Sequence, residues 1–195
     1  MESGFGRALG RTAVGAVVAA VSAIAMACTQ PVGTPESTTG DPSADVWVAG
    51  DSLAEGAGEA MTDVYNIAVG GATFSQGFTI HTRVMGALAA VVDRPETVVV
   101  IGGHNDLVHW GATPAEVVTE MARLVADVAS TYPGTTVRLV TQPWWIHPAI
   151  GVVNDGIVAD LAAIDCGAAT WGSSDDDVHP DDFGPYAACI EAALR

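Results

Sequence analysis

The sequence predicts an α/β domain in which helices cover both faces of a parallel sheet. Two observations carry this prediction: short β-branched runs typical of buried strands, and apolar helical patterns between them. The clearest strand is the run Thr97-Val98-Val99-Val100-Ile101, and the clearest helix has a 3.6-residue apolar period over residues 115–130. Since five such strands are separated by helical connections, we expect a three-layer α/β/α sandwich with a five-stranded parallel sheet.

The expected elements follow one another from about residue 46 to the end of the chain. Strands are predicted at residues 46–49, 64–68, 97–101, 136–141 and 168–171. Helices are predicted at residues 78–92, 115–130, 149–164 and 182–194. Thr113 and Pro114 form a typical helix start, with threonine as the N-cap and proline as the first helical residue.

The first 27 residues have the layout of a bacterial export signal. Arg7 and Arg11 give it a positive start, and residues 12–27 form an uncharged, largely apolar run. This run is shorter than a membrane-spanning helix needs. Small residues precede Cys28 and resemble the lipobox of bacterial lipoproteins, so we expect lipidation of Cys28, with plain secretion and an uncleaved anchor as alternatives.

Three segments follow from this division of the chain. Residues 1–27 are the expected signal peptide, and residues 28–45 are rich in Pro, Ser, Thr and Gly, which predicts a flexible tether. Residues 46–195 form the expected globular domain. We therefore expect an exported protein, lipid-anchored to the cell membrane or secreted.

Charge and composition narrow the expected partners. The chain has a formal net charge of -16, no lysine and seven scattered arginines, so it lacks the basic stripe that nucleic acid binding needs. The histidines have no spacing typical of a metal site, and we expect neither a metal nor a cofactor. The acidic run at residues 173–182 leaves a solvated loop or a calcium site as alternatives. Membrane contact is expected only through a lipid at Cys28.

Residues suited to serine-based catalysis follow the predicted strands. Ser52 lies in a Gly-Asp-Ser turn after the first strand, where an Asx-type turn into a helix is the simpler interpretation. Asp176 precedes His179 by three residues, so one short turn would let the carboxylate orient the imidazole. Asn105 and the glycines near Gly71 follow two other strands. Because ligands bind at the carboxyl ends of parallel strands, these residues are expected to meet there.

In these motifs the chain resembles the SGNH hydrolases, also called the GDSL esterase/lipase family. Its four signature blocks appear in order: Gly50-Asp51-Ser52-Leu53, Asn66 with Gly71, Gly103-x-Asn105-Asp106 and Asp176-x-x-His179. The resemblance covers the whole domain and implies a flavodoxin-like fold. One departure is Ala68, which stands where the family usually has glycine.

The resemblance also implies a role for each matched residue. Ser52 would be the nucleophile, His179 the general base and Asp176 its orienting partner. The oxyanion hole would consist of the backbone N–H groups of Ser52 and Gly71 and the side-chain amide of Asn105. The implied reaction is hydrolysis of a carboxylic ester through an acyl-enzyme, and the partner is an ester substrate.

Aromatic and histidine side chains near the predicted strand ends are candidates for substrate binding. They are His104, Trp110, Trp144 and Trp145. The simpler interpretation is that the tryptophans cover the sheet edge and that the histidine is structural. The short domain leaves little chain for a lid, which favours small acyl or acetyl esters on small molecules, lipids or saccharides. A non-catalytic surface-binding lipoprotein and an acyltransferase are the alternative functions.

Cys166 and Cys189 remain once Cys28 is assigned to lipidation. An even pair of cysteines in an exported domain indicates a disulfide. Such a bridge would brace the loop that carries Asp176 and His179. Two buried free thiols are the alternative.

Overall fold

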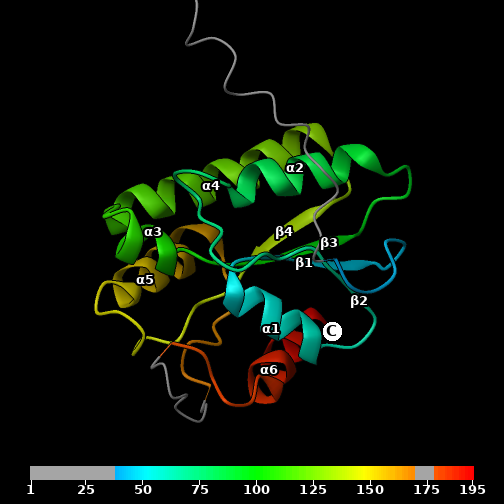
Figure 1. Ribbon diagram of the computed structural model, residues 1–195. Helices are drawn as coiled ribbons and strands as arrows, with labels where there is room; N and C mark the ends of the chain where they lie inside the picture. The colour runs from blue at the N-terminus through cyan, green and yellow to red at the C-terminus, as the bar shows by residue number, and fades with distance from the viewer. Residues whose placement is uncertain (1–37, 170–177) are drawn as a thin grey trace, which may run out of the picture. The chain divides into compact units, whose positions relative to one another are not determined.

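The computed structural model describes residues 38–169 and 178–195. Its sheet has four parallel strands in the order β2-β1-β3-β4 (Figure 1). The strands are β1 (Val46–Gly50), β2 (Val64–Asn66), β3 (Thr97–Ile101) and β4 (Thr136–Leu139). Since β2 and β3 lie on opposite sides of β1, the strand order reverses at β1, and the carboxyl end of β1 is where such sheets bind ligands.

Helices cover both faces of the sheet, as Figure 1 shows. They are α1 (Ser52–Ala60), α2 (Ile80–Ala90), α3 (His104–His109), α4 (Pro114–Thr131), α5 (Ile150–Leu161) and α6 (Gly184–Leu194). One apolar cluster packs α2 to α5 against one face, and a second packs α1 and α6 against the other. The predicted three-layer α/β/α class is therefore confirmed.

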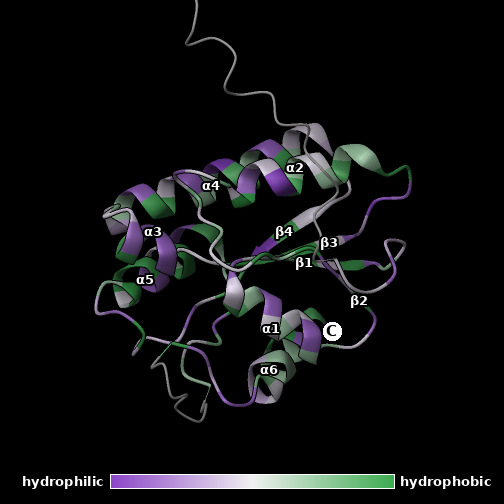
Figure 2. Ribbon diagram, viewed as in Figure 1, coloured by the Kyte–Doolittle hydropathy of each residue, from purple (hydrophilic) through white to green (hydrophobic). Residues whose placement is uncertain are grey.

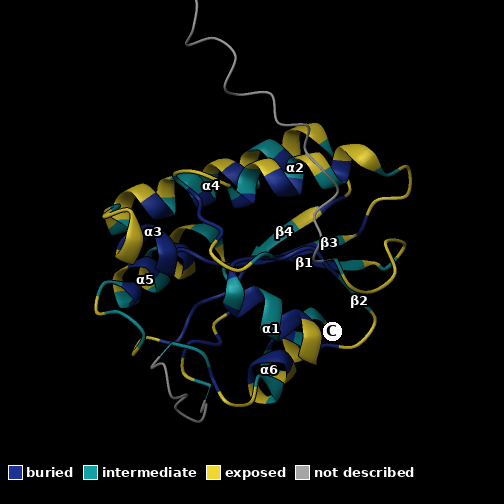
Figure 3. Cartoon of the chain, in the orientation of Figure 1, coloured by how far each residue is buried: buried dark blue, intermediate teal, exposed yellow. Residues whose placement is uncertain are grey.

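Alternation along the central strands creates the two cores. Trp47 and Ala49 of β1 belong to the cluster that contains α2 to α5, whereas Val48 belongs to the cluster with α1 and α6. The two central strands are hydrophobic and buried, as Figures 2 and 3 show, while the helices bury only one side. This pattern is what a parallel sheet covered on both faces requires.

A fifth strand was expected at residues 168–171. Residues 168 and 169, which the structure describes, are not in a strand, so the prediction is wrong for them. Residues 167–168 form a turn, and among the described residues a single parallel bridge, between Val140 just after β4 and Ile164, joins the chain to the sheet there. The chain after Ile164 leaves the ladder because the N–H groups of Cys166 and Gly167 donate to Thr141 Oγ1 instead of to a strand.

Helix α1 begins at the Asx-type turn that the sequence indicated, but no helix was predicted over its range, where Gly56 and Gly58 lower the helix propensity. The structure explains both glycines. A Cβ at Gly58 would lie 2.5 Å from Asn66 Nδ2, and a Cβ at Gly56 would lie 2.4 Å from the Phe183 ring. The helix therefore sacrifices propensity for close packing against the end of β2 and the start of α6.

The described part of the expected tether, residues 38–45, contacts the sheet. Thr39 forms an antiparallel bridge with Asn66 at the end of β2. The expected signal peptide and Cys28 lie outside the described residues. Within the ranges that the structure describes, no helix has both the length and the apolar character that crossing a membrane requires.

A disulfide joins Cys166 to Cys189 of α6, with a sequence separation of 23 residues. It encloses the segment that contains His179. We predict that replacing both cysteines with alanine lowers the free energy of unfolding by about 3 kcal/mol, the chain-entropy value for a loop of this size. Urea unfolding would measure it, with reduced wild-type protein as the matched control. Equal stability of oxidised and reduced wild type would contradict the prediction.

Candidate active site

Ser52 lies at the start of α1, directly after the turn that ends β1. Gly50 has a φ of +145°, and a Cβ there would lie only 1.7 Å from the carbonyl oxygen of Ile101. Only glycine fits this close approach between β1 and β3. Asp51 then caps the helix, because its Oδ1 accepts a hydrogen bond from Leu53 N–H at 3.0 Å. Ser52 is thereby placed, half-buried, as the first residue of α1.

His179 and Ser52 are hydrogen-bonded although 127 residues separate them. The distance between His179 Nε2 and Ser52 Oγ is 2.7 Å. This is the geometry that a general base needs to take the proton of a serine nucleophile. Asp176, the expected orienting residue, lies outside the described residues.

The backbone N–H of Ser52 is the first of the three expected oxyanion donors. As the first residue of α1, Ser52 has an N–H without a partner inside the helix. The positive end of the helix dipole also lies here and favours negative charge. The start of α1 is therefore suited to stabilising an oxyanion.

Gly71 lies in a tight turn after β2. Ala72 N–H donates to the carbonyl oxygen of Val69 at 3.1 Å, and Gly71 has a φ of +78°. The Gly71 N–H donates to no backbone carbonyl in the described part of the chain. This turn thus presents an unused donor on an exposed loop, at a position where a Cβ would be strained.

Asn105 is buried in the first turn of α3, next to the same loop. Its Nδ2 donates to the carbonyl oxygen of Ala72 at 3.1 Å. An amide nitrogen carries two hydrogens, so this bond fixes the side chain and leaves the second hydrogen for a ligand.

Asn66, from the second motif block, has a structural position. Its Nδ2 donates to the carbonyl oxygen of Glu55 on α1 at 2.9 Å, and its Oδ1 accepts from Ala68 N–H at 3.0 Å. The side chain therefore joins α1 to the start of the loop that carries Gly71.

The candidate substrate-binding residues lie in the loops and the short helix after β3 and β4. Trp144 and Trp145 form an edge-to-face pair, and both are exposed, as is Trp110 at the end of α3. His104 is buried and packs edge-to-face against His147, with a ring separation of 6.4 Å. Burial lowers the pKa of the His104 imidazole, and His147 adds to that effect. A neutral His104 at physiological pH follows.

Among the residues that the structure describes, no three His, Cys, Asp or Glu side chains come together as a metal site would require. A hollow of about 920 Å³ lies at the amino ends of β1 and β2, lined in part by Thr39, Asp45 and Asp63. Ser52 follows the carboxyl end of β1, so this hollow lies at the opposite edge of the sheet.

Two buried acidic residues beside the site, Asp51 and Asp106, were not singled out from the sequence. Asp51 Oδ2 has no hydrogen-bond partner among the described residues. Burial raises the pKa of the Asp51 carboxyl to about 7; the hydrogen bond from Leu53 N–H opposes this, and the negative charge of Asp106 adds to it. The only sequence signal for either residue is its place beside Ser52 or Asn105.

The raised pKa of Asp51 makes stability depend on pH. In the unfolded chain the carboxyl loses its proton near its ordinary pKa of 3.8, whereas in the folded chain it keeps the proton up to about pH 7. The free energy of unfolding therefore decreases as pH rises from about 3.8 to about 7, and this carboxyl causes no further decrease above about pH 7. We predict that Asp51→Asn, which preserves the helix cap, removes this loss.

Relative to wild type, the free energy of unfolding of Asp51→Asn should increase from pH 4 to pH 8, by up to about 4 kcal/mol for a shift of this size. Urea unfolding across that range would measure the difference. Asp155→Asn, at an exposed position of α5, controls for the loss of one carboxyl. A difference that stays constant with pH would show that Asp51 does not behave in this way.

Comparison with known proteins supports the fold. No family model matches the chain, and no curated protein matches it in sequence. Several solved structures are similar in fold, and three of them are described. A putative acylhydrolase from Bacteroides fragilis has a TM-score of 0.61 and 17% identity, over 76% of this chain and 85% of its own. The aryl esterase of M. smegmatis has a TM-score of 0.59 and 16% identity, over 76% of this chain and 98% of its own.

The third structure is a member of the lipolytic protein G-D-S-L family from Veillonella parvula. It has a TM-score of 0.56 and 16% identity, over 76% of this chain and 96% of its own. Structural similarity at this level of sequence identity supports the fold and does not establish the activity. The chain therefore has the fold of the GDSL (SGNH) hydrolases, the family that its four motifs resemble.

Proposed function

We propose that this protein is a serine hydrolase of carboxylic esters, with Ser52 as nucleophile and His179 as general base. The observation that carries the proposal is the 2.7 Å hydrogen bond between His179 Nε2 and Ser52 Oγ at the start of α1. Nucleophile, base and helix N-terminus lie at the carboxyl end of β1, where sheets of this topology bind ligands.

In the first half of the reaction, Ser52 Oγ attacks the ester carbonyl carbon while His179 Nε2 takes the hydroxyl proton. The tetrahedral oxyanion forms near the start of α1, where the N–H groups of Ser52 and Gly71 and the Asn105 amide would donate to it. When the intermediate collapses, the C–O bond to the alcohol breaks and His179 returns its proton to the leaving oxygen. An acyl-enzyme on Ser52 remains.

In the second half, His179 takes a proton from a water molecule, and the resulting hydroxide attacks the acyl carbon. The second tetrahedral intermediate releases Ser52 Oγ, which receives the proton from His179, and the free carboxylic acid leaves. Asp176 is proposed to accept a hydrogen bond from the other ring nitrogen of His179 and so to fix its orientation.

The substrate proposal is an ester with a small acyl group, on a small molecule, a lipid or a saccharide. Exposed aromatic side chains in the loops after β3 and β4 support it, because their apolar faces can cover a sugar ring or a short acyl chain. These side chains are Trp110, Trp144 and Trp145. Export and lipidation at Cys28 remain part of the proposal and would place the enzyme outside the cytoplasm.

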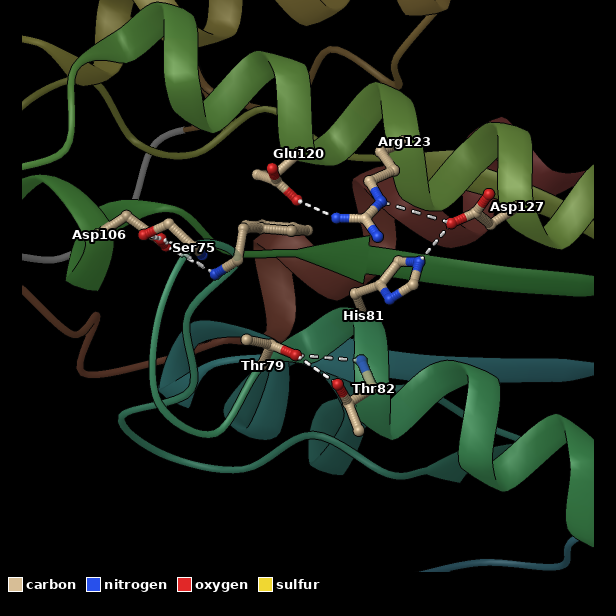
Figure 4. A network of polar contacts seen from close by, with 9 residues as sticks. Ser75, Thr79, His81, Thr82, Asp106, Glu120, Arg123 and Asp127 are labelled. Atoms are coloured by element: carbon tan, nitrogen blue, oxygen red, sulfur yellow. Dashed lines mark hydrogen bonds and ion pairs between the residues drawn. The ribbon is translucent and has the colours of Figure 1, made fainter. Parts of the chain in front are cut away.

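The test is hydrolysis of p-nitrophenyl acetate, butyrate and octanoate by the wild-type chain and by two variants. Ser52→Ala and His179→Ala should each lower kcat by at least about 1,000-fold, because the members of such a unit act together. Ser130→Ala and His81→Ala are the matched controls. Ser130 is exposed, and His81 pairs with Asp127 at 2.9 Å in the network between α2 and α4 (Figure 4).

A Ser52→Ala variant as active as wild type would overturn the assignment of the nucleophile. Folded wild-type protein without turnover on any of these esters would contradict hydrolysis of small esters. Acyl transfer to an added sugar acceptor would then distinguish an acyltransferase from a binding protein.

A further inference from the structure

Asp106 is a fully buried residue on α3. Among the described residues, every hydrogen bond to its carboxylate comes from one loop. Phe74 N–H donates to its Oδ1 at 3.1 Å and to its Oδ2 at 2.9 Å. Ser75 donates to Oδ1 twice, from its N–H at 2.7 Å and from its Oγ at 2.6 Å (Figure 4). A buried charge is expensive unless such donors satisfy it, and bonds to a charged acceptor are the strong kind.

This loop is the one that carries Gly71. Asn105 and Asp106 are consecutive in α3, and they hold successive points of the loop: Asn105 binds the carbonyl of Ala72, and Asp106 binds Phe74 and Ser75. Two of the three proposed oxyanion donors, the Gly71 N–H and the Asn105 amide, thus depend on how α3 and this loop meet.

Beyond the contact with α3, the loop is also closed by its own hydrogen bonds. Thr73 N–H donates to the carbonyl of Phe78 at 3.3 Å, and Ile80 N–H donates to the carbonyl of Thr73 at 2.7 Å. These bonds do not involve Asp106. Loss of its carboxylate should therefore shift the loop relative to α3 without unfolding α2 or the sheet.

We infer that Asp106 is a positioning residue for the oxyanion hole: its carboxylate fixes the loop of Gly71 against α3, so that the Gly71 N–H and the Asn105 amide converge on one point. This inference rests on the proposed function. The inference goes beyond the proposed function because it makes the geometry of the oxyanion hole depend on Asp106, a residue that touches neither the substrate nor the reacting atoms. A misplacement of about 1 Å is enough to cost on the order of 100-fold in rate.

The variants separate position from charge. Asp106→Asn removes the charge but keeps a carbonyl that can occupy the Oδ1 position, where three of the four hydrogen bonds are made. Asp106→Ala removes all of them, and Ser75→Ala removes only the hydroxyl donor. If Asp106 acts by position, kcat should fall up to about 100-fold in Asp106→Ala and less than about 10-fold in the other two, with KM nearly unchanged.

A substrate pair gives a readout that a merely structural role would not change. A thionoester places sulfur, a weak hydrogen-bond acceptor, where the oxyanion of an ester would form. The ratio of kcat/KM for p-nitrophenyl acetate to that for its thiono analogue should fall severalfold in Asp106→Ala and remain near wild type in the control Asp127→Asn. Asp127 is a partly exposed carboxylate on α4 that accepts a hydrogen bond from His81.

An unchanged ratio with only a lower melting temperature would overturn the inference, as would equal losses in Asp106→Asn and Asp106→Ala. If Asp106→Ala does not fold, Asp106→Asn and Ser75→Ala carry the same comparison. Amide hydrogen exchange over residues 68–76 is independent of activity. If the wild type is inactive but the Asp106 variants exchange faster than it does, the positioning of the loop is supported and only the proposed function is rejected. If exchange in the variants is unchanged, the positioning is rejected.

Discussion

The hydrogen bond between His179 Nε2 and Ser52 Oγ constrains the architecture more than any other contact at the site. Its partners come from the beginning and the end of the domain, so both must be held at one edge of the sheet. Ser52 is held because β1 can approach β3 closely at Gly50 and because Asp51 caps α1. The hydrogen bond on which the proposed catalysis rests thus depends on backbone packing that allows no side chain at Gly50.

The other partner depends on polar contacts at the carboxyl end of β4. Thr141 Oγ1 accepts hydrogen bonds from the N–H groups of Cys166 and Gly167, and the Tyr186 hydroxyl donates to the Thr141 carbonyl at 2.7 Å. The disulfide to Cys189 closes the same region. These bonds hold the chain on either side of the segment that contains His179, at residues 166–167 and at Tyr186. The N–H groups of Cys166 and Gly167 thus anchor the chain beside the candidate site instead of pairing with β4.

The sequence pattern correctly predicted the elements that depend on neighbouring residues in the chain. The strand at residues 97–101 and the helix start at Thr113 appear as expected, the latter with a capping box to Glu116. The turn into α1 was indicated but its range was not predicted, because its glycines serve tertiary packing. Residues 168 and 169 were wrongly expected to be in a strand, because the preceding N–H groups donate to a threonine side chain. The motifs indicated Ser52 and His179, but the role of Asp106 could not be predicted, because a buried acceptor is recognised only by the donors that surround it.

The central claim is that Ser52 is a nucleophile activated by His179. Its most direct measurement is the intact mass of the protein after reaction with diethyl p-nitrophenyl phosphate, followed by peptide mapping. The account predicts one diethylphosphoryl group on Ser52, equimolar release of p-nitrophenol, no labelling of Ser52→Ala and slow labelling of His179→Ala. Equal labelling of Ser52→Ala, or a label on another residue of the wild type, would contradict it.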